Sequence, residues 1–431
     1  MEVFSIVILL FSFLLLLSIG TPVAWSIIIS SLFTLLVSVP FLPALTTISQ
    51  RMATGIDSFA LLAIPFFILS GELMNKGGVA HRLVAFAKAL VGFLPGGLAL
   101  INVISAMLMG SVAGSAMASA SAMGSILGPE MEKEGYSKGF GVAINITSAT
   151  TGLVIPPSNI LIVYSLASGG ASIAALFLAG YIPGILTGLF LMAVAMIWAK
   201  KKNFKTGKRA PLKTVFGSFV RAFPSLMLLF VVIGGIVSGV FTATEASAIA
   251  VIYTLVLGFV YNEITFKTLP TILLKSSTTT AIVMFLIGAS MSMSWVLSYE
   301  NIPEMISSGI LSLSDNKIVI LLLINFTLLF VGIFMDMTPA VLIFTPIFLP
   351  IVTQLGIDPV HFGIIMILNL CIGLCTPPVG SVLFVGVGVA NTSIQKVIKP
   401  LIPLFLAMIV ALLLVTYIPA LSLWLPSIFD L

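Results

Sequence analysis

Charged residues are scarce in this chain. Asp, Glu, Lys and Arg together make up 8% of its 431 residues, whereas 59% of the residues are hydrophobic. The mean hydropathy is +1.25. Such a composition supplies too little polar surface to coat a water-soluble globule, so it excludes the soluble classes and predicts an integral membrane protein whose solvent is lipid.

Histidine and cysteine are also nearly absent. The chain has only His81 and His361, which we expect in loops, and Cys371 and Cys375, which lie one helical turn apart. Two cysteines are too few for a disulfide framework or a metal cluster, so we interpret them as small packing residues. The chain has no Gly-Lys-Ser/Thr phosphate loop for ATP and no evident pairing of a nucleophile with a base, which argues against an enzyme.

The basic residues that are present gather in predicted loops. The net charge of +5 would suggest a nucleic-acid partner for a soluble chain, but loops rich in Lys and Arg instead report how a membrane protein is oriented. The chain begins Met1-Glu2 with an acidic flank, and no small-residue cleavage site closes the first apolar run before Gly20. We therefore interpret this run as a retained membrane helix rather than a signal peptide.

A diproline motif occurs twice within apolar runs. Gly152-Leu-Val-Ile-Pro-Pro157-Ser-Asn and Gly373-Leu-Cys-Thr-Pro-Pro378-Val-Gly lie 221 residues apart (378 − 157), and flanking residues such as Gly135 and Gly356 keep the same offset. Proline interrupts a membrane helix because it lacks a backbone N–H. Two such interruptions at matching places in two halves of a chain are the best sequence indication of a substrate and ion site at the bilayer midplane.

This offset divides the chain into two repeats and predicts an all-α, polytopic fold. Residues 1–199 form the first repeat, residues 200–214 a basic cytoplasmic linker, and residues 215–431 the second repeat. Because a crossing needs about 20 apolar residues, each repeat contains about five spans. In the first repeat they cover residues 3–20, 23–41, 59–74, 140–164 and 173–199.

Each repeat also contains a segment that does not fit a single span. Residues 95–130 are interrupted by Gly110-Ser-Val-Ala-Gly-Ser115, and residues 318–352 by Gly332-Ile-Phe-Met-Asp-Met-Thr-Pro339. Unpaired backbone groups at these interruptions cannot face lipid. We therefore predict two re-entrant helical hairpins whose tips reach the midplane, beside broken helices at about 140–164 and 362–390.

The distribution of charge predicts that the two repeats are inverted. An odd number of spans places matching loops on opposite sides of the membrane, so only one of each pair should be basic. Residues 76–88 contain three basic residues, whereas the matching segment reads Glu300-Asn-Ile-Pro-Glu304. The linker is therefore expected in the cytoplasm and both termini in the periplasm or outside the cell.

Two further segments mix charge with apolar residues at helical spacing. Residues 79–93 and 302–313 suit helices that lie in the plane of the membrane interface, with a solvated loop as the alternative. Glu245, in Phe241-Thr-Ala-Thr-Glu-Ala246, is expected to cap or brace the start of a span, and Glu72 lies near a predicted helix end.

Ion binding is the chemistry that two hairpin tips and two broken helices predict. A helix that stops in the membrane leaves carbonyl oxygens that can coordinate Na⁺, and the next helix begins with free N–H groups that attract a carboxylate. The candidates for the Na⁺ shell are Ser111, Gly114, Thr151, Pro156, Gly332, Thr376, Pro377 and Gly380, and those for the substrate are Ser115, Ser158, Asn159, Asp336 and Thr338. The alternative for small residues, which we prefer for Ser119 and Ser121, is close helix packing.

Asp336 is the most informative single residue. An ionised Asp near the centre of a membrane helix costs about 2.5 to 3.5 kcal/mol, so its presence in a hairpin tip indicates a partner such as a cation or several N–H donors. The alternative is that Asp336 caps the helix that follows it.

Several segments together resemble the signature sequences of one family. Gly20-Thr-Pro-Val-Ala24, Phe241-Thr-Ala-Thr-Glu-Ala246, Ile155-Pro-Pro-Ser158 and Gly373-Leu-Cys-Thr-Pro-Pro-Val-Gly380 with Leu383-Phe384-Val385 are similar to those of the large membrane (permease, DctM-like) subunit of tripartite ATP-independent periplasmic (TRAP) transporters. The likeness covers nearly the whole chain. One departure is Thr242-Ala243-Thr244-Glu245, where the family usually has Thr-Pro-Thr-Glu.

The resemblance implies more than the spacing shows. It implies Na⁺-coupled uptake of an organic acid such as a C4-dicarboxylate, a sugar acid or sialic acid across the bacterial inner membrane, by an elevator mechanism. It also implies a small four-helix membrane subunit and a periplasmic substrate-binding protein as partners, with Ser115, Ser158 and Asp336 in the regions that hold ions and substrate. An ion channel, or a solitary ion-coupled organic-anion transporter, is the alternative.

Overall fold

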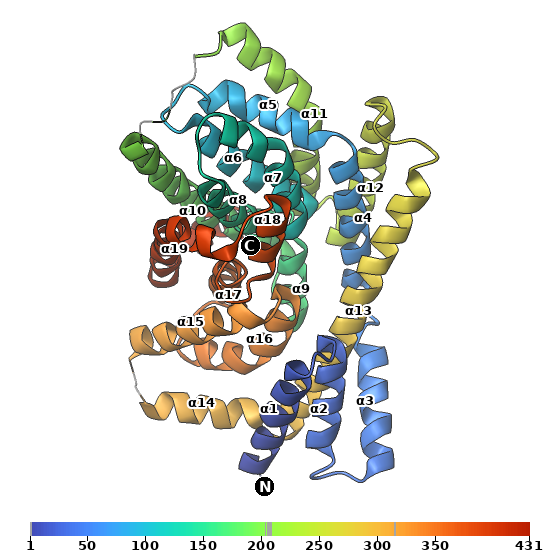
Figure 1. Ribbon diagram of the computed structural model, residues 1–431. Helices are drawn as coiled ribbons and strands as arrows, with labels where there is room; N and C mark the ends of the chain where they lie inside the picture. The colour runs from blue at the N-terminus through green and yellow to red at the C-terminus, as the bar shows by residue number, and fades with distance from the viewer. Residues whose placement is uncertain (1, 203, 205–208, 314–315) are drawn as a thin grey trace.

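The computed structural model describes residues 2–202, 204, 209–313 and 316–431, and the regular secondary structure of these residues consists of helices, without strands (Figure 1). The first half contains α1 (Glu2–Ser18), α2 (Val23–Leu35), α3 (Phe41–Gly55), the 3-10 turn η1 (Phe59–Leu62), α4 (Ala63–Lys76), α5 (Val79–Val91), α6 (Gly97–Ala113), α7 (Ala116–Lys133), α8 (Lys138–Thr151), α9 (Asn159–Ala167) and α10 (Ile173–Lys202). The second half contains α11 (Leu212–Val237), α12 (Ala243–Val260), α13 (Leu269–Tyr299), α14 (Ile302–Leu313), α15 (Lys317–Phe334), α16 (Met337–Gln354), α17 (Pro359–Gly373), α18 (Ser381–Val389), α19 (Ile394–Tyr417) and α20 (Ala420–Ile428). In the described residues, eight helices are long and apolar enough to cross a membrane.

The order of elements in the second half repeats that of the first. A hairpin, α6–α7 or α15–α16, precedes a helix that is interrupted at the diproline motif, and a long helix follows. The interrupted helices end at Thr151 and Gly373 and resume at Asn159 and Ser381. The hairpins turn at Gly114–Ser115 and at Met335–Asp336, within the segments where the sequence predicts interruptions. This order of elements agrees with the two predicted repeats. Their inverted orientation stays a prediction.

The helices form two groups in space (Figure 1). We call α1–α4 and α11–α13 the scaffold group, and α6–α10 with α15–α20 the hairpin group. The chain passes between the groups through α5, between α10 and α11, and through α14. In Figure 1, α5 lies across the upper end of the molecule and α14 across the lower end. The hairpin group is thus linked to the scaffold group at both ends.

Each hairpin is held against its broken helix by a contact between two glycines. A Cβ added to Gly152 would lie 2.9 Å from the Cα of Gly110, and one added to Gly373 would lie 2.5 Å from the Cα of Gly332. Only glycine permits this approach of two backbones, a common device of membrane helices. The two contacts occupy equivalent places in the two halves, so each interruption is packed against protein rather than lipid.

The two interruptions also touch each other. The thiol of Cys371 donates to the carbonyl oxygen of Thr150 at 3.0 Å, and the hydroxyl of Thr150 lies 3.2 Å from the sulfur of Cys375. Both cysteines are fully buried, which agrees with their interpretation as packing residues.

Two basic segments that are far apart in the sequence lie at the same end of the molecule. The ring of Tyr136, just before α8, lies 4.0 Å from that of Phe204, after the basic end of α10, and Gly139 packs against the backbone of Lys396. At the other end, Glu300 accepts hydrogen bonds from Ser5 of α1 at 2.7 Å and from Ser38 at 2.5 Å. The basic segments after α10 and at the start of α19 therefore share one end, as the predicted orientation requires.

Two local predictions are confirmed. Residues 79–91 and 302–313 are helices rather than loops, with buried Leu83 and Ile302 on their inner faces and exposed Lys88 and Glu304 on their outer faces. Glu245 closes a capping box at the start of α12, in which its carboxylate accepts from the N–H of Thr242 at 2.8 Å. The alanine that replaces the usual family proline leaves this cap intact.

Other predictions are wrong. The span predicted at residues 23–41 ends at Leu35, because the chain turns before Pro40, and residues 41–55 form a further helix, α3, that was not predicted. The histidines are not in loops: His81 lies in α5, and His361 is buried near the start of α17, where its Nδ1 lies 2.5 Å from the hydroxyl of Ser422. In the predicted linker, residues 203 and 205–208 lie outside the described residues.

The contact between Gly332 and Gly373 generates the first prediction. Gly373→Ala would force the backbones of α15 and α17 apart, and such overpacking costs about 1 to 3 kcal/mol. Gly388→Ala in α18 is the matched control, because a Cβ there meets no atom within 4 Å. Thermal unfolding in detergent is expected to show a lower midpoint for Gly373→Ala alone; equal midpoints would contradict the packing described here.

Candidate functional site

A cavity of about 580 Å³ lies between the scaffold group and the hairpin group. Both hairpin tips, both interruptions and the facing sides of α4 and α13 contribute to its wall. The polar residues that line it are Glu72, Asn75, Ser115, Ser121, Asn159, Lys275, Thr279, Asp336, Thr338 and Ser381. It is the place in the described structure where most of the unusual features of the sequence meet.

Four helices begin at this cavity. The first residues of α7, α9, α16 and α18 are Ala116, Asn159, Met337 and Ser381, and all four line the wall. The N-terminus of a helix exposes free N–H groups and a partial positive charge of about half an elementary charge. Four such ends around one space produce a site suited to a carboxylate.

The hairpin tips supply their own caps. The hydroxyl oxygen of Ser115 accepts from the N–H of Ala118 at 3.3 Å, and the carboxylate of Asp336 accepts from the N–H of Met337 at 2.9 Å. Ser115 and Asp336 are equivalent in the two halves, at the offset of 221 residues (336 − 115). Asp336 thus has the capping role that was predicted as the alternative, and it also lines the cavity, whereas its role toward an ion or substrate stays a prediction.

At the first interruption, one hydroxyl has no partner. Ser158 is 1% exposed, and its Oγ makes no hydrogen bond, so α9 begins without a side-chain cap. The next residue, Asn159, packs against the hairpin tip: a Cβ added to Gly114 would lie 2.9 Å from its amide nitrogen. A buried hydroxyl that lacks a partner costs free energy, and an ion, a ligand or a water molecule bound there would remove that cost.

A hydrogen bond between backbone groups joins the second interruption to its hairpin. The N–H of Gly380 donates to the carbonyl oxygen of Ile333 at 3.2 Å, and Gly380 has a φ of +40°, a conformation that favours glycine. No side chain caps α18 either. The hydroxyl of Ser381, its first residue, is buried without a hydrogen-bond partner.

The predicted residues divide into a lining set and a supporting set. Gly114, Ser115, Asn159, Asp336 and Thr338 line the cavity. Ser158 is buried directly behind it, next to Asn159. The supporting residues lie in the tips and interruptions but not on the cavity wall: Ser111, Thr151, Pro156, Gly332, Thr376, Pro377 and Gly380.

The supporting hydroxyls fit a small cation such as Na⁺. Ser111, Thr151 and Thr376 donate their protons to the carbonyls of Leu108, Thr147 and Ile372, at 2.9, 2.8 and 2.7 Å. A hydroxyl that donates in this way keeps both lone pairs for a metal ion. Neutral oxygens of this kind are the ligands that hard cations prefer, so the donor set of each half suits Na⁺.

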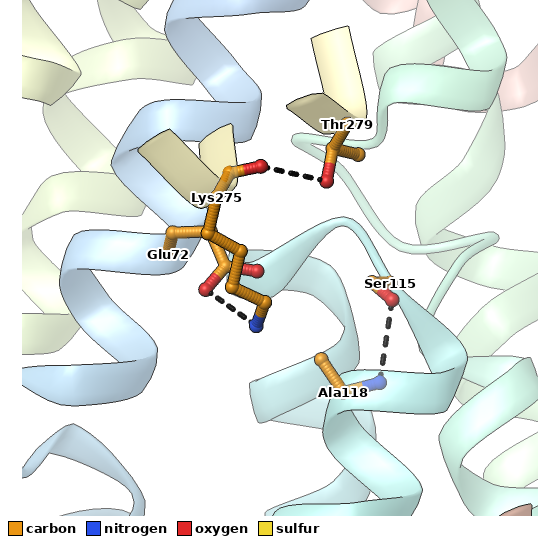
Figure 2. Close-up of polar contacts among 5 residues, drawn as sticks. All are labelled: Glu72, Ser115, Ala118, Lys275 and Thr279. Carbon is orange, nitrogen blue, oxygen red and sulfur yellow. Dashed lines mark hydrogen bonds and ion pairs between the residues drawn. The ribbon is translucent and has the colours of Figure 1, made fainter. Parts of the chain in front are cut away.

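Six polar residues of the lining were not predicted as site residues: Ser121, for which close packing was preferred, and the five named next. Glu72, Asn75, Lys275 and Thr279 come from α4 and α13, and Ser381 directly follows the predicted Gly380. Figure 2 shows Glu72 and Lys275 joined by an ion pair of 2.8 Å, opposite the hairpin tip with Ser115. The lone Lys within an apolar helix was the sequence signal that could have identified Lys275. Ser121 also lines the cavity, whereas Ser119 is buried and donates to the carbonyl of Ala106 at 2.8 Å.

Comparison with family models gives one match. Residues 10–421 match the model described as tripartite ATP-independent periplasmic transporter, DctM component. The match extends over both hairpins and both interruptions.

Three curated relatives are similar over nearly their whole length or most of it. The protein YgiK of Salmonella typhimurium is 56% identical, over 99% of this chain and 98% of its own. The C4-dicarboxylate TRAP transporter large permease protein DctM of Pseudomonas aeruginosa is 41% identical, over 86% of this chain and 87% of its own. The sialic acid TRAP transporter large permease protein SiaM of Vibrio cholerae is 38% identical, over 97% of this chain and 98% of its own.

A solved structure supports the fold. The YdaH transporter of Alcanivorax borkumensis superposes with a TM-score of 0.65, over 91% of this chain and 90% of that chain. The two sequences are 14% identical, so the comparison concerns the fold alone.

The two serines of α7 provide a matched test of the cavity. A single cysteine at Ser121 is expected to react with a polar maleimide, because Ser121 lines the cavity, whereas one at Ser119 is expected to stay unlabelled. The native Cys371 and Cys375 are fully buried, so they should not interfere. Equal labelling of Ser119→Cys and Ser121→Cys would show that α7 does not face the cavity as described.

Proposed function

Because this chain belongs to the DctM family, the large membrane subunits of TRAP transporters, we propose that it carries an organic acid across the bacterial inner membrane with Na⁺ as the coupling ion. The family assignment makes it a multi-pass transport protein for organic acids. Coupling to Na⁺, the identity of the acid and the way the protein moves are parts of the proposal.

The observation that supports this function best is the convergence of four helix N-termini on one cavity. Their N–H groups attract a carboxylate, and no side chain caps α9 or α18, so donors at these two ends are free for it. The hydroxyls of Ser158 and Ser381, at these two ends, are buried without a hydrogen-bond partner. A cation bound there would offset the charge of Asp336 and strengthen the attraction for an anion.

The proposed movement is of the elevator type. The cavity lies at the boundary of the two helix groups, and the chain crosses that boundary only through α5, the connection between α10 and α11, and α14. A hairpin group connected in this way can slide along the scaffold group while its own packing, including the paired glycines, stays unchanged.

The lining of the cavity suggests which side it faces. Along α13, its residues are Lys275, Thr279 and Val283, all in the first half of a helix that runs to Tyr299. That half lies toward the end where α5 contributes Arg82 and Lys88. Since basic segments stay in the cytoplasm, we assign this end to the cytoplasm, with both chain termini on the periplasmic side.

The named relatives indicate the chemical class of the substrate, which is a carboxylate. The named relatives handle a C4-dicarboxylate and sialic acid at 41% and 38% identity, and both compounds are carboxylates. A cavity of about 580 Å³ accommodates either. We therefore infer that a periplasmic binding protein selects the acid, and that this chain and a small membrane subunit move it.

Uptake by reconstituted complexes tests the Na⁺-coupled function. The chain, with the small subunit and the binding protein of its transporter, is placed in vesicles and offered succinate, N-acetylneuraminate, isethionate and 2,3-diketogulonate, with an inward Na⁺ or K⁺ gradient. We expect saturable uptake of one acid that requires Na⁺. Uptake that is indifferent to the Na⁺ gradient would contradict the proposed coupling, and current that rises with voltage without saturation would indicate a channel.

Two substitutions test the site itself. Asp336→Ala is expected to abolish Na⁺-driven uptake, and Ser158→Ala to raise the Na⁺ concentration for half-maximal uptake by about tenfold, the typical effect of one lost ligand. Because the Ser158 hydroxyl has no partner, its removal should not lower the thermal stability. Asp358→Asn is the control, since Asp358 caps α17 at 2.7 Å but does not line the cavity. Unchanged uptake by both site variants would refute the assignment.

The requirement for partners gives a further expectation. Vesicles that contain this chain without its small subunit, or without the binding protein, should take up none of the four acids above the background of empty vesicles. Restoring the missing protein should restore uptake. Robust uptake by this chain alone would favour a solitary transporter.

A further inference from the structure

Lys275 has an unusual position for a basic residue. It lies in α13, a helix of 31 residues whose neighbouring turns contribute the buried Ile272 and Ser276 to the scaffold group. Lys275 is on a different face and lines the cavity with Thr279 and Val283, at intervals of four residues. Ionisable residues within membrane helices are costly and almost always face a functional cavity.

The partner of Lys275 lies on the next scaffold helix. Its Nζ is 2.8 Å from Oε2 of Glu72 in α4, and Figure 2 shows the pair beside the hairpin tip. The Glu72 side chain is 15% exposed and the Lys275 side chain 57% exposed. The Glu72 side chain is therefore largely covered by the wall, while more than half of the Lys275 side chain is exposed. Both residues belong to the scaffold group and line the cavity from its side.

The charge of the cavity wall is unbalanced. Among the described residues that line it, the charged ones are Glu72, Lys275 and Asp336. Lys275 is the single cation of this set, so an anion that enters meets one fixed positive side chain. That side chain is already paired, and the carboxylate of the ligand must compete with the carboxylate of Glu72.

We propose that Lys275 receives the carboxylate of the organic acid on the scaffold side of the cavity, and that Glu72 is its exchangeable counter-ion. The proposal rests on the function proposed above and adds a residue to it. When the acid leaves the helix N-termini, its carboxylate displaces Glu72 from Lys275. Glu72 then displaces the acid, which leaves the protein. No proton is transferred, because one carboxylate replaces another.

The location of the pair gives this exchange a direction. Lys275 is six residues into α13 and Glu72 four residues before the end of α4, so both lie toward the end we assign to the cytoplasm. An acid on its way from the hairpin tips to that end passes the pair. A lysine alone would retain the anion there, and the neighbouring carboxylate shortens its stay.

A purely structural ion pair is the competing explanation, and it makes a different prediction. If the bond only joins α4 to α13, Glu72→Gln and Lys275→Gln should weaken the protein in the same direction, with no effect on the affinity for the acid. If the acid exchanges with Glu72, the two substitutions should change the affinity in opposite directions. The sign of the change in KM therefore separates the two explanations.

Uptake kinetics form the first part of the test. For whichever of the four acids the wild-type complex transports, Lys275→Gln is expected to raise KM about tenfold, the effect of losing one charge-assisted hydrogen bond. Glu72→Gln is expected to lower both KM and kcat several-fold, because the acid binds more tightly and leaves more slowly. Lys275→Arg should retain most of the wild-type affinity. Lys88→Gln is the matched control, because the Lys88–Glu130 pair of 3.2 Å lies outside the cavity.

The second part needs no uptake and uses the full chain in vesicles. A reporter Thr279→Cys lies one turn from Lys275 on the same wall, and its reaction rates with anionic sulfonatoethyl and cationic trimethylammonioethyl methanethiosulfonate are compared. The ratio of the anionic to the cationic rate should rise in Glu72→Gln and fall in Lys275→Gln, and Lys88→Gln should leave it unchanged. Succinate, added at millimolar concentration, should slow the anionic reagent when Lys275 is present and have no effect in Lys275→Gln.

The two parts distinguish the possible failures. If no acid is taken up but the reporter behaves as expected, the transport function is wrong and the anion site at Lys275 holds. A second outcome is Na⁺-driven uptake in which the two substitutions change KM in the same direction, or in which the reporter ratio is unchanged in Glu72→Gln. In either case the exchange is wrong and the transport function holds.

Discussion

The whole structure depends on one constraint, which is that backbone N–H and C=O groups cannot remain unpaired in hydrocarbon. Eight helix ends lie at the two hairpin tips and the two interruptions, and each must be covered by protein or open to a polar space. The contacts of Gly110 with Gly152 and of Gly332 with Gly373 provide the cover, since they bring hairpin and interruption together without an intervening side chain. What they leave uncovered is the set of helix N-termini around the cavity. Packing and binding are thus two results of the same pair of interruptions.

The two halves share their framework but differ where they face the cavity. Ser115 is equivalent to Asp336, so one half presents a neutral hydroxyl where the other presents a carboxylate. Asn159 lines the cavity, whereas its equivalent, Gly380, does not. Glu72 and Lys275 add charges on the scaffold side. A symmetric framework could not distinguish the ends of an asymmetric acid. Divergence at these few positions supplies that difference while the backbone contacts are kept.

Sequence reasoning succeeded where a residue type dictates local backbone. The diprolines located the ends of α8 and α17, and the Thr242–Glu245 pattern located the start of α12. It failed where tertiary contacts decide. The α3 segment is too polar for a span, and it is helical where Ala44 and Ile48 are buried against neighbouring helices. The scaffold side of the cavity could not be predicted either. Glu72 and Lys275 are 203 residues apart, and nothing in either segment indicates that α4 and α13 are neighbours.

The placement of α5 and α14 has a mechanical effect. An amphipathic helix that lies in the plane of the membrane interface resists movement into the hydrocarbon core, because its charged face would be desolvated. In the orientation proposed above, α5 and α14 are two such helices, one near the upper end and one near the lower end of the molecule (Figure 1). In the proposed elevator movement, travel of the hairpin group toward either leaflet would strain the helix at the opposite leaflet. The two helices would then set a resting height, and bound ions and substrate would have to supply the free energy that moves the group away from it.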